Sequence, residues 1–105
     1  MNSHCTYTPT GRIDASNAGV CEKDLLALME ANGPSAIIDL SGLSYISSAG
    51  LRVLLVGAKT ARAKGGKAVI CCAPATIAEV LKMSGFDKVI PLLADHAAAE
   101  AHLGG

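Results

Sequence analysis

The stretch Asp39–Leu55, DLSGLSYISSAGLRVLL, decides the fold, because a buried strand gives way within it to an amphipathic helix. The run SAIIDL leads into it and has the continuous apolar character of a strand that is covered on both faces. We expect the helix to begin near Ser48, with Ser47 as its N-cap, since a serine oxygen can accept from the free N–H groups of the first turn. The apolar residues of this helix recur at three- and four-residue steps and are Leu51, Leu54, Leu55, Ala58 and Ala61.

The rest of the chain alternates helices with strands. The expected elements are a helix over 16–31, a strand over 35–40, a helix from 48 to the Gly65-Gly66 pair, a strand over 67–73, a helix around 77–84, a strand over 88–93 and a helix over 94–103. Pro91 places the strand over 88–93 near a sheet edge. Strands separated by helices of this length need right-handed crossovers, so the predicted fold class is α/β with a largely parallel sheet.

Two segments give weaker patterns. The loop SGLSYI, which contains Ser44, is typical of turn chemistry. Residues 1–10 form a poorly defined N-terminal segment. The residues HCTYTPTGRID could supply either one strand or a ragged hairpin.

Composition restricts the possible functions. The chain has 105 residues, which predicts one domain over 1–105. Its formal net charge is zero and it has only two tyrosines and one phenylalanine as aromatics, so neither the basic field nor the stacking surfaces of a nucleic-acid binder are expected. No apolar run is long enough to cross a bilayer, and the first residues lack the pattern of a secretory signal, so we expect a cytoplasmic protein without direct membrane insertion.

The cysteines and histidines predict neither a metal nor a cofactor. None of the four cysteines has C-x-x-C spacing, and a strand would direct Cys71 and Cys72 to opposite faces. His96 and His102 lie six residues apart on an expected helix, and therefore on different faces. Buried cysteines that act as small hydrophobic residues are the simpler interpretation, with metal ligation or redox work as the alternative.

Ser47 and Ser48 admit two interpretations. The first is a structural helix cap, worth about 1 kcal/mol. The second is a modification site, because a helix N-terminus carries partial positive charge and free N–H groups that tolerate a phosphate. A phosphate in a protein interface would then expel the partner while the domain stays folded. Gly50 in the first helical turn suggests the close approach of a neighbouring backbone or of a partner.

The residues IIDLSGLSYISSAGLRVLL resemble the signature of STAS domains, specifically the SpoIIAA-like bacterial anti-sigma factor antagonists. GRIDASNA from Gly11 is similar to the turn before the first helix of that family, and GGKAVICCAPATIAEVLKMSGFDKVIPLLAD is similar to its later strand, helix and final strand. The resemblance implies a single STAS-type domain. Its sheet would have four or five strands in a mostly parallel or mixed arrangement, with helices packed mainly on one side.

The resemblance also implies the site residues. Ser48 takes the position of the phosphoacceptor, Ser47 that of an acidic residue and Ala49 that of a second hydroxyl, while Gly50 and Leu51 agree with the family. Because Ser47 and Ala49 depart from the pattern, phosphorylation does not follow from family membership alone. The expected partner-binding residues are Asp14, Ser47, Ala49, Gly50 and Arg52.

Two functions are compatible with these residues. The first is an anti-sigma factor antagonist that binds a serine-kinase anti-sigma factor, is switched off by phosphorylation at Ser48 and is reset by a serine phosphatase. The second is an unphosphorylated STAS subunit of a lipid-transport ATPase or a sensory complex. Neither is an enzyme, and we expect a monomer or a weak dimer. Arg52, Lys59 and Arg62 share a helix face that is either simply solvated or the rim of a partner surface.

Overall fold

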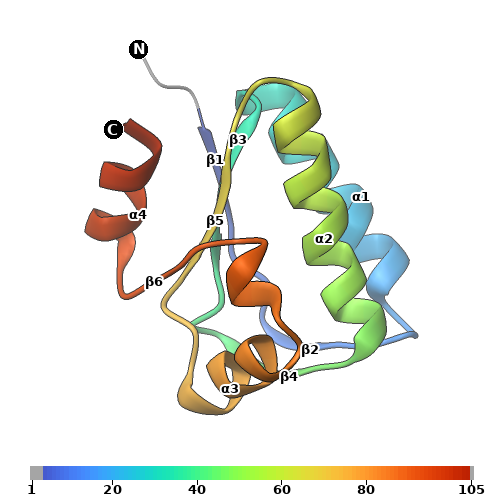
Figure 1. Cartoon of the computed structure of the whole chain (residues 1–105). Coiled ribbons are helices and arrows are strands. Elements are labelled where there is room, and N and C mark those ends of the chain that lie inside the picture. The colour runs from blue at the N-terminus through green and yellow to red at the C-terminus, as the bar shows by residue number, and fades with distance from the viewer. Residues whose placement is uncertain (1–3, 105) are drawn as a thin grey trace.

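The computed structural model describes residues 4–104 and contains one four-stranded sheet, one two-stranded sheet and four α-helices within that range (Figure 1). The strand order of the larger sheet is β1-β3-β5-β6, and all its pairings are parallel. Strands β2 and β4 form the smaller sheet and are also parallel. The elements along the chain are β1 (His4–Tyr7), β2 (Gly11–Ile13), α1 (Ala18–Asn32), β3 (Ser35–Asp39), β4 (Leu43–Ile46), α2 (Ser48–Ala63), β5 (Ala68–Cys71), α3 (Ala75–Met83), a short 3-10 helix (Phe86–Lys88), β6 (Leu92–Leu93) and α4 (His96–Gly104).

The larger sheet is covered on both faces. Helices α1 and α2 pack on one face, and α4 lies on the other (Figure 1). Alternation along β3 divides the core accordingly, since Ile38 joins the large cluster under α1 and α2 while Ile37 joins a small cluster under α4. The expectation of helices mainly on one side therefore holds for the two longest helices, and the continuous apolar runs are explained by burial on both faces.

Helix α2 packs closely against α1 and the sheet. Leu54 and Ala61 are fully buried, as the apolar stripe predicts, but Val53 and two glycines share the buried face with them. A Cβ built on Gly57 would lie 2.6 Å from Leu25 Cδ2 of α1. The absence of a side chain at Gly57 thus lets the two helices approach each other.

Three sequence-based predictions need correction. The prediction of a loop over SGLSYI is wrong for its last four residues, because Leu43–Ile46 is the strand β4. The Ser44 hydroxyl donates to the Gly11 carbonyl at 2.9 Å. The strand over 88–93 shrinks to Leu92–Leu93, although it does lie at a sheet edge. The first residues of the predicted strand are not extended, because the Ile90 N–H donates to the Phe86 carbonyl at 2.8 Å in a helical turn.

The N-terminal segment is the third correction. Its residues 4–7 form β1 at the other edge of the large sheet, whereas residues 1–3 lie outside the described part of the chain. The next strand, β2, belongs to the small sheet. The hairpin alternative is therefore wrong, because β1 pairs in parallel with β3 and β2 pairs in parallel with β4.

Candidate functional site

The start of α2 lies beside the end of β2. Parallel pairing of β2 with β4 places Ile13 opposite Ile46. The N–H of Ser47, the next residue along, donates to the Ile13 carbonyl at 2.9 Å. This hydrogen bond joins the turn that follows β2 to the first turn of α2, so two segments distant in sequence form one surface.

Ser47 is the N-cap of α2, as predicted. Its backbone is extended, and its side-chain oxygen accepts from the Gly50 N–H at 3.3 Å. Ser48 is the first residue of the helix and is exposed to solvent, whereas Ser47 is half-buried. The two hydroxyls therefore differ, because the Ser47 hydroxyl caps the helix whereas the Ser48 side chain is exposed to solvent.

Gly50 is buried against this same surface. A Cβ built there would lie 2.6 Å from Ile46 Cγ1 and 3.0 Å from the Ile13 carbonyl oxygen. The close approach predicted for Gly50 is thus made within the chain itself, by the Ile46 and Ile13 side chains as well as by the Ile13 carbonyl. Ala49 beside it is half-buried.

Asp14 occupies the turn between β2 and α1. One of its carboxylate oxygens accepts from the Ser16 N–H at 2.9 Å and from the Ser16 hydroxyl at 2.5 Å. These two bonds, helped by Arg12, whose Nε lies 3.6 Å from the other oxygen, hold the pKa of Asp14 below its ordinary value. The carboxylate is therefore ionised at neutral pH, one residue beyond the carbonyl that receives Ser47.

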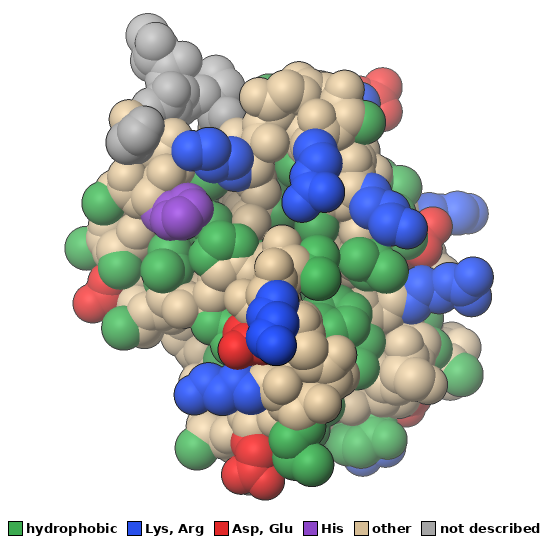
Figure 2. Space-filling model, viewed as in Figure 1, with side chains coloured by type: hydrophobic (Ala, Val, Ile, Leu, Met, Phe, Trp, Pro, Cys, Tyr) green, Lys and Arg blue, Asp and Glu red, His purple; other side chains and the backbone are tan. Residues whose placement is uncertain are grey.

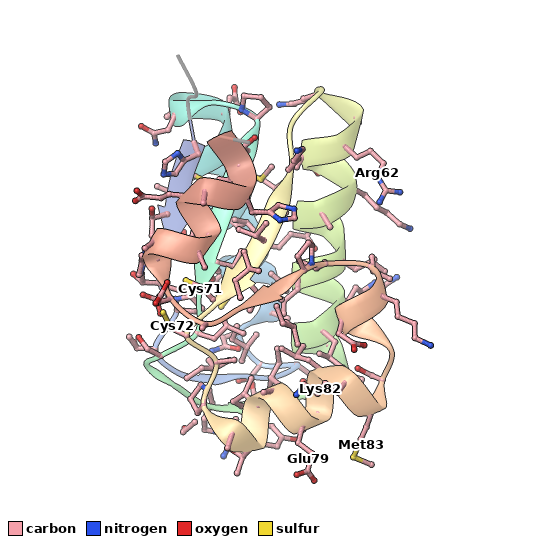
Figure 3. The ribbon with its side chains drawn as sticks, turned by 60° about the vertical axis from the view of Figure 1, so that its left-hand side comes forward. Arg62, Cys71, Cys72, Glu79, Lys82 and Met83 are labelled. Carbon is pink, nitrogen blue, oxygen red and sulfur yellow. The ribbon has the colours of Figure 1, made fainter. Side chains whose placement is uncertain are left out.

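Basic and aromatic side chains border this surface, and further basic side chains continue along α2 to Arg62 in its last turn. The guanidinium of Arg12 lies 4.4 Å from the centre of the Tyr45 ring, across the β2–β4 pair. Arg52, Lys59 and Arg62 are all exposed. Lys and Arg side chains gather on the face that α2 presents (Figure 2), and Arg62 points outward from α2 (Figure 3). Arg52 stands four residues after Ser48, so the two share a face of the helix.

A second group of polar side chains lies at the ends of β3 and β5. The prediction that Cys71 and Cys72 point to opposite faces is wrong, because their sulfur atoms are 3.4 Å apart. Cys72 follows the last residue of β5 and has φ of 61°, so the extended geometry that alternates side chains no longer applies. Burial, followed by the contact with Cys72, raises the pKa of Cys71 to about 12.

The family model described as the STAS domain matches residues 1–99. The chain belongs to the STAS domain family. A protein of Bordetella bronchiseptica named "Putative anti-sigma factor antagonist BtrV" is 37% identical to this STAS domain over 91 residues, which cover 87% of this chain and 78% of that protein. This relative supports the resemblance on which the predicted site residues rest.

Solved structures agree with the fold of this STAS domain. The crystal structure of an anti-sigma factor antagonist from Mycobacterium paratuberculosis matches it with a TM-score of 0.82 and 23% identity, over 97% of this chain and 86% of that one. The structure of the anti-sigma factor antagonist SpoIIAA in its unphosphorylated form matches with a TM-score of 0.79 and 15% identity, over 100% of this chain and 92% of that one. In the described part of the STAS domain, no helix has the length and apolar character needed to cross a membrane.

Proposed function

We propose that this STAS domain is an anti-sigma factor antagonist that binds a serine-kinase anti-sigma factor and is released when Ser48 is phosphorylated. The observation that carries the proposal is the exposed position of Ser48 at the first residue of α2, beside the half-buried Ser47 that caps the helix. A kinase can reach the Ser48 hydroxyl without disturbing the cap. The 37% identity to a protein named as an antagonist supports this role.

The proposed docking surface consists of the Asp14 turn and the first two turns of α2. The hydrogen bond from the Ser47 N–H to the Ile13 carbonyl holds these two segments together. Asp14 contributes a carboxylate and Arg52 an exposed guanidinium, while Ala49 contributes a small apolar contact. Gly50 is buried, so its part in the proposal is to set the start of α2 against β2.

A phosphate on Ser48 would be tolerated by the domain itself. It would add a charge of about −1.5 to −2 at the positive end of the helix dipole. No acidic residue lies in the first turn of α2, and Arg52, four residues on, can pair with the phosphate. The phosphate would then both bring negative charge into the interface and remove Arg52 from its contact with the partner. A coupling of about 1–3 kcal/mol between phosphate and partner is enough for a switch.

The remaining parts of the proposal follow from this role. ATP and catalysis belong to the partner kinase, and a serine phosphatase restores the unmodified form. The proposed action on a regulator of transcription takes place in the cytoplasm, through protein contacts rather than nucleic acid, with the STAS domain as a monomer or a weak dimer.

The test of phosphorylation compares three hydroxyls. The protein is used to isolate partners from its own cells, and the mixture is incubated with ATP before intact mass is measured. We expect one added phosphate in the wild type and in Ser44→Ala, and none in Ser48→Ala. Ser47→Ala should still accept one phosphate, but more slowly, because it changes an expected partner-binding residue. Addition that survives in Ser48→Ala, or no addition in the presence of the recovered kinase, would refute the switch.

The test of docking compares two arginines on one helix. Arg52→Glu should slow association with the anti-sigma factor, with a larger effect at low salt, because charge at the rim of an interface acts mainly on the association rate. Arg62→Glu makes the same charge change ten residues further along α2 and serves as the matched control. Equal rates for the two variants would place the docking surface elsewhere.

One observation favours a second function. Ser47 stands where the family pattern has an acidic residue, and this substitution removes a carboxylate that could orient the phosphoacceptor. A constitutive STAS subunit of a lipid-transport ATPase or a sensory complex would need no such carboxylate. Recovery of a transporter ATPase without any kinase, together with no phosphate on Ser48, would favour this alternative.

A further inference from the structure

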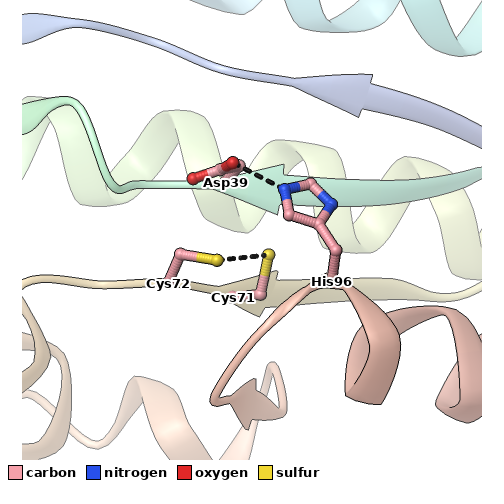
Figure 4. Close-up of side chains that lie close together, drawn as sticks. All are labelled: Asp39, Cys71, Cys72 and His96. Carbon is pink, nitrogen blue, oxygen red and sulfur yellow. Dashed lines mark hydrogen bonds and ion pairs between the residues drawn. The ribbon is translucent and has the colours of Figure 1, made fainter.

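Four side chains with metal-ligand chemistry converge where β3 and β5 end and α4 begins (Figure 4). Asp39 is the last residue of β3, Cys71 is the last residue of β5, Cys72 follows it, and His96 opens α4. The carboxylate oxygen, the two sulfur atoms and the imidazole nitrogen all lie within 4.8 Å of one another. These residues are called the Cys-His-Asp cluster below.

The distances reach those of a tetrahedral metal site after shifts of about 1 Å in the side chains. Zinc bonds of about 2.3 Å to sulfur and about 2.0–2.2 Å to nitrogen and oxygen place the ligand atoms of a tetrahedron about 3.3–3.8 Å apart. In the cluster the two sulfur atoms are 3.4 Å apart, and His96 Nε2 is 2.6 Å from Asp39 Oδ2. The hydrogen bond between His96 and Asp39 would have to lengthen, and the widest pairs would have to close by about 1 Å.

The backbone fixes the positions of three of the ligands. Asp39 and Cys71 are register partners in the β3–β5 ladder. The Leu40 N–H donates to the Cys71 carbonyl at 3.1 Å, and the Cys72 N–H donates to the Leu93 carbonyl at 3.3 Å. Ligands carried by a hydrogen-bonded sheet are held more accurately than ligands on a loop.

His96 is held by the cap of α4. Asp95 accepts the Ala98 N–H on its carboxylate at 2.9 Å and the Ala99 N–H on its carbonyl at 3.0 Å, and this makes His96 the first residue of the helix. Asp39 is oriented in turn, because its second oxygen accepts the Ser41 N–H at 2.8 Å. A hydrogen bond of this kind from an outer residue is what orients a metal-binding carboxylate.

The backbone of Cys72 is an independent sign of a specific role. Its φ of 61° lies in the left-handed region, and Cys72 is the only residue other than glycine with positive φ in the part of the chain that the structure describes. Such conformations persist where the surroundings impose them and concentrate at functional sites. Here the conformation brings the Cys72 sulfur toward the Cys71 sulfur, as the positions of the two labelled side chains show (Figure 3).

We propose that the Cys-His-Asp cluster binds one Zn²⁺ ion with four protein ligands. Two thiolates and an imidazole favour zinc and similar transition metals over Mg²⁺ or Ca²⁺, and a complete set of four protein ligands is typical of a structural site. On binding, each thiol loses its proton to solvent. The proton between His96 Nε2 and Asp39 Oδ2 is released to solvent or carried on His96 Nδ1, and the ion takes its place. The site with Asp39 ionised and His96 neutral then carries one net negative charge, and it links α4 to β3 and β5.

The probe for this site is Co²⁺, followed by Zn²⁺. Untagged, reduced protein is titrated with Co²⁺ in the absence of oxygen. We expect one equivalent to give the strong visible bands of tetrahedral cobalt and a thiolate-to-cobalt charge-transfer band, and Zn²⁺ should displace both. Zn²⁺ should also raise the melting temperature, because it binds the folded state.

Matched variants decide whether the cluster is the site. Cys72→Ser and His96→Gln should weaken metal binding by more than about 100-fold, since even the loss of an outer residue costs about 10–100-fold. Cys21→Ser removes a cysteine of α1, and His102→Ala removes an exposed histidine of α4, and both should bind as the wild type does. Circular dichroism checks that each variant is folded.

Three results would overturn the proposal. The first is a six-coordinate cobalt spectrum without a thiolate band. The second is loss of binding in Cys21→Ser or His102→Ala equal to that in Cys72→Ser. The third is the absence of metal binding by the reduced protein. A disulfide between Cys71 and Cys72 in its oxidised form would then make the pair a redox group instead.

Discussion

Gly50→Ala should destabilise the domain although it improves helix propensity. The added Cβ would lie 2.6 Å from Ile46 Cγ1 and 3.0 Å from the Ile13 carbonyl oxygen, so either a core side chain or the backbone must move. Overpacking of this kind costs about 1–3 kcal/mol. The gain from replacing glycine in a helix is at most about 1 kcal/mol. The expected net loss is about 1–2 kcal/mol, and each kcal/mol lowers the melting temperature of a domain of this size by roughly 4–8 °C.

Gly19→Ala is the matched control. Gly19 is the second residue of α1 and Gly50 the third residue of α2, so both occupy the first turn of a helix. Apart from its chain neighbours and the backbone of its own helix, no atom lies within 4 Å of a Cβ built on Gly19. Gly19→Ala should therefore leave stability unchanged or raise it by up to about 1 kcal/mol. Urea unfolding followed by circular dichroism measures both variants, and Gly50→Ala as stable as Gly19→Ala would refute the close approach at β2.

Three further predictions concern single side chains. Ser47→Ala should lower the free energy of unfolding by about 1 kcal/mol, because the helix cap is lost. Ser48→Ala, at an exposed position, should change this free energy by less than about 0.5 kcal/mol. Equal losses for the two variants in urea titrations would contradict the different roles of the two serines. Ser16→Ala should raise the pKa of Asp14 toward its ordinary value, because it removes the Ser16 hydroxyl bond, which is the largest cause of the lowering. An NMR titration of the carboxyl carbon tests this. Burial raises the pKa of Tyr7 in the folded state. The neutral phenol therefore contributes its full stability below the pKa of about 10 in the unfolded chain, and this stability is lost as the pH rises toward the folded-state pKa. Tyr7→Phe should reduce this loss of stability at alkaline pH, as measured by urea unfolding.

The sequence predicts the main elements of the fold because their signals are local. The helix cap at Ser47, the start of α2 at Ser48 and the edge position of the strand that follows Pro91 are confirmed, since each depends on backbone chemistry within a few residues. The family resemblance also puts Ser47 and Ser48 at the start of this helix. The phosphoacceptor role of Ser48 stays a prediction.

Pairing between distant segments is harder to predict. Ser44 and Tyr45 look like loop residues because β4 is short and partly polar, and it becomes a strand only by pairing with β2. The stacking of Arg12 on Tyr45 depends on that pairing and has no sequence signal of its own.

The Cys-His-Asp cluster is not predicted from the alternation of side chains along a strand, although the sequence holds a signal for part of it. Alternation along a strand fails at Cys72 because the backbone there is no longer extended. However, Asp39 and Cys71 both end buried apolar runs, and the ends of neighbouring parallel strands meet at one edge of a sheet. Comparing strand ends with each other could have brought these residues together, whereas the position of His96 depends on how α4 folds back over the sheet.

The division of the core into a large and a small cluster has a consequence for local motion. Ala99 is the only fully buried residue of α4, and the cluster beneath it contains three further buried residues, Ile37, Val69 and Cys71. Elements with so few buried apolar contacts separate from a domain at lower free energy than its global unfolding. The amide hydrogens of α4 should therefore exchange with solvent before those of α2, and the sheet can lose this helix transiently while the surface around Ser48 keeps its shape.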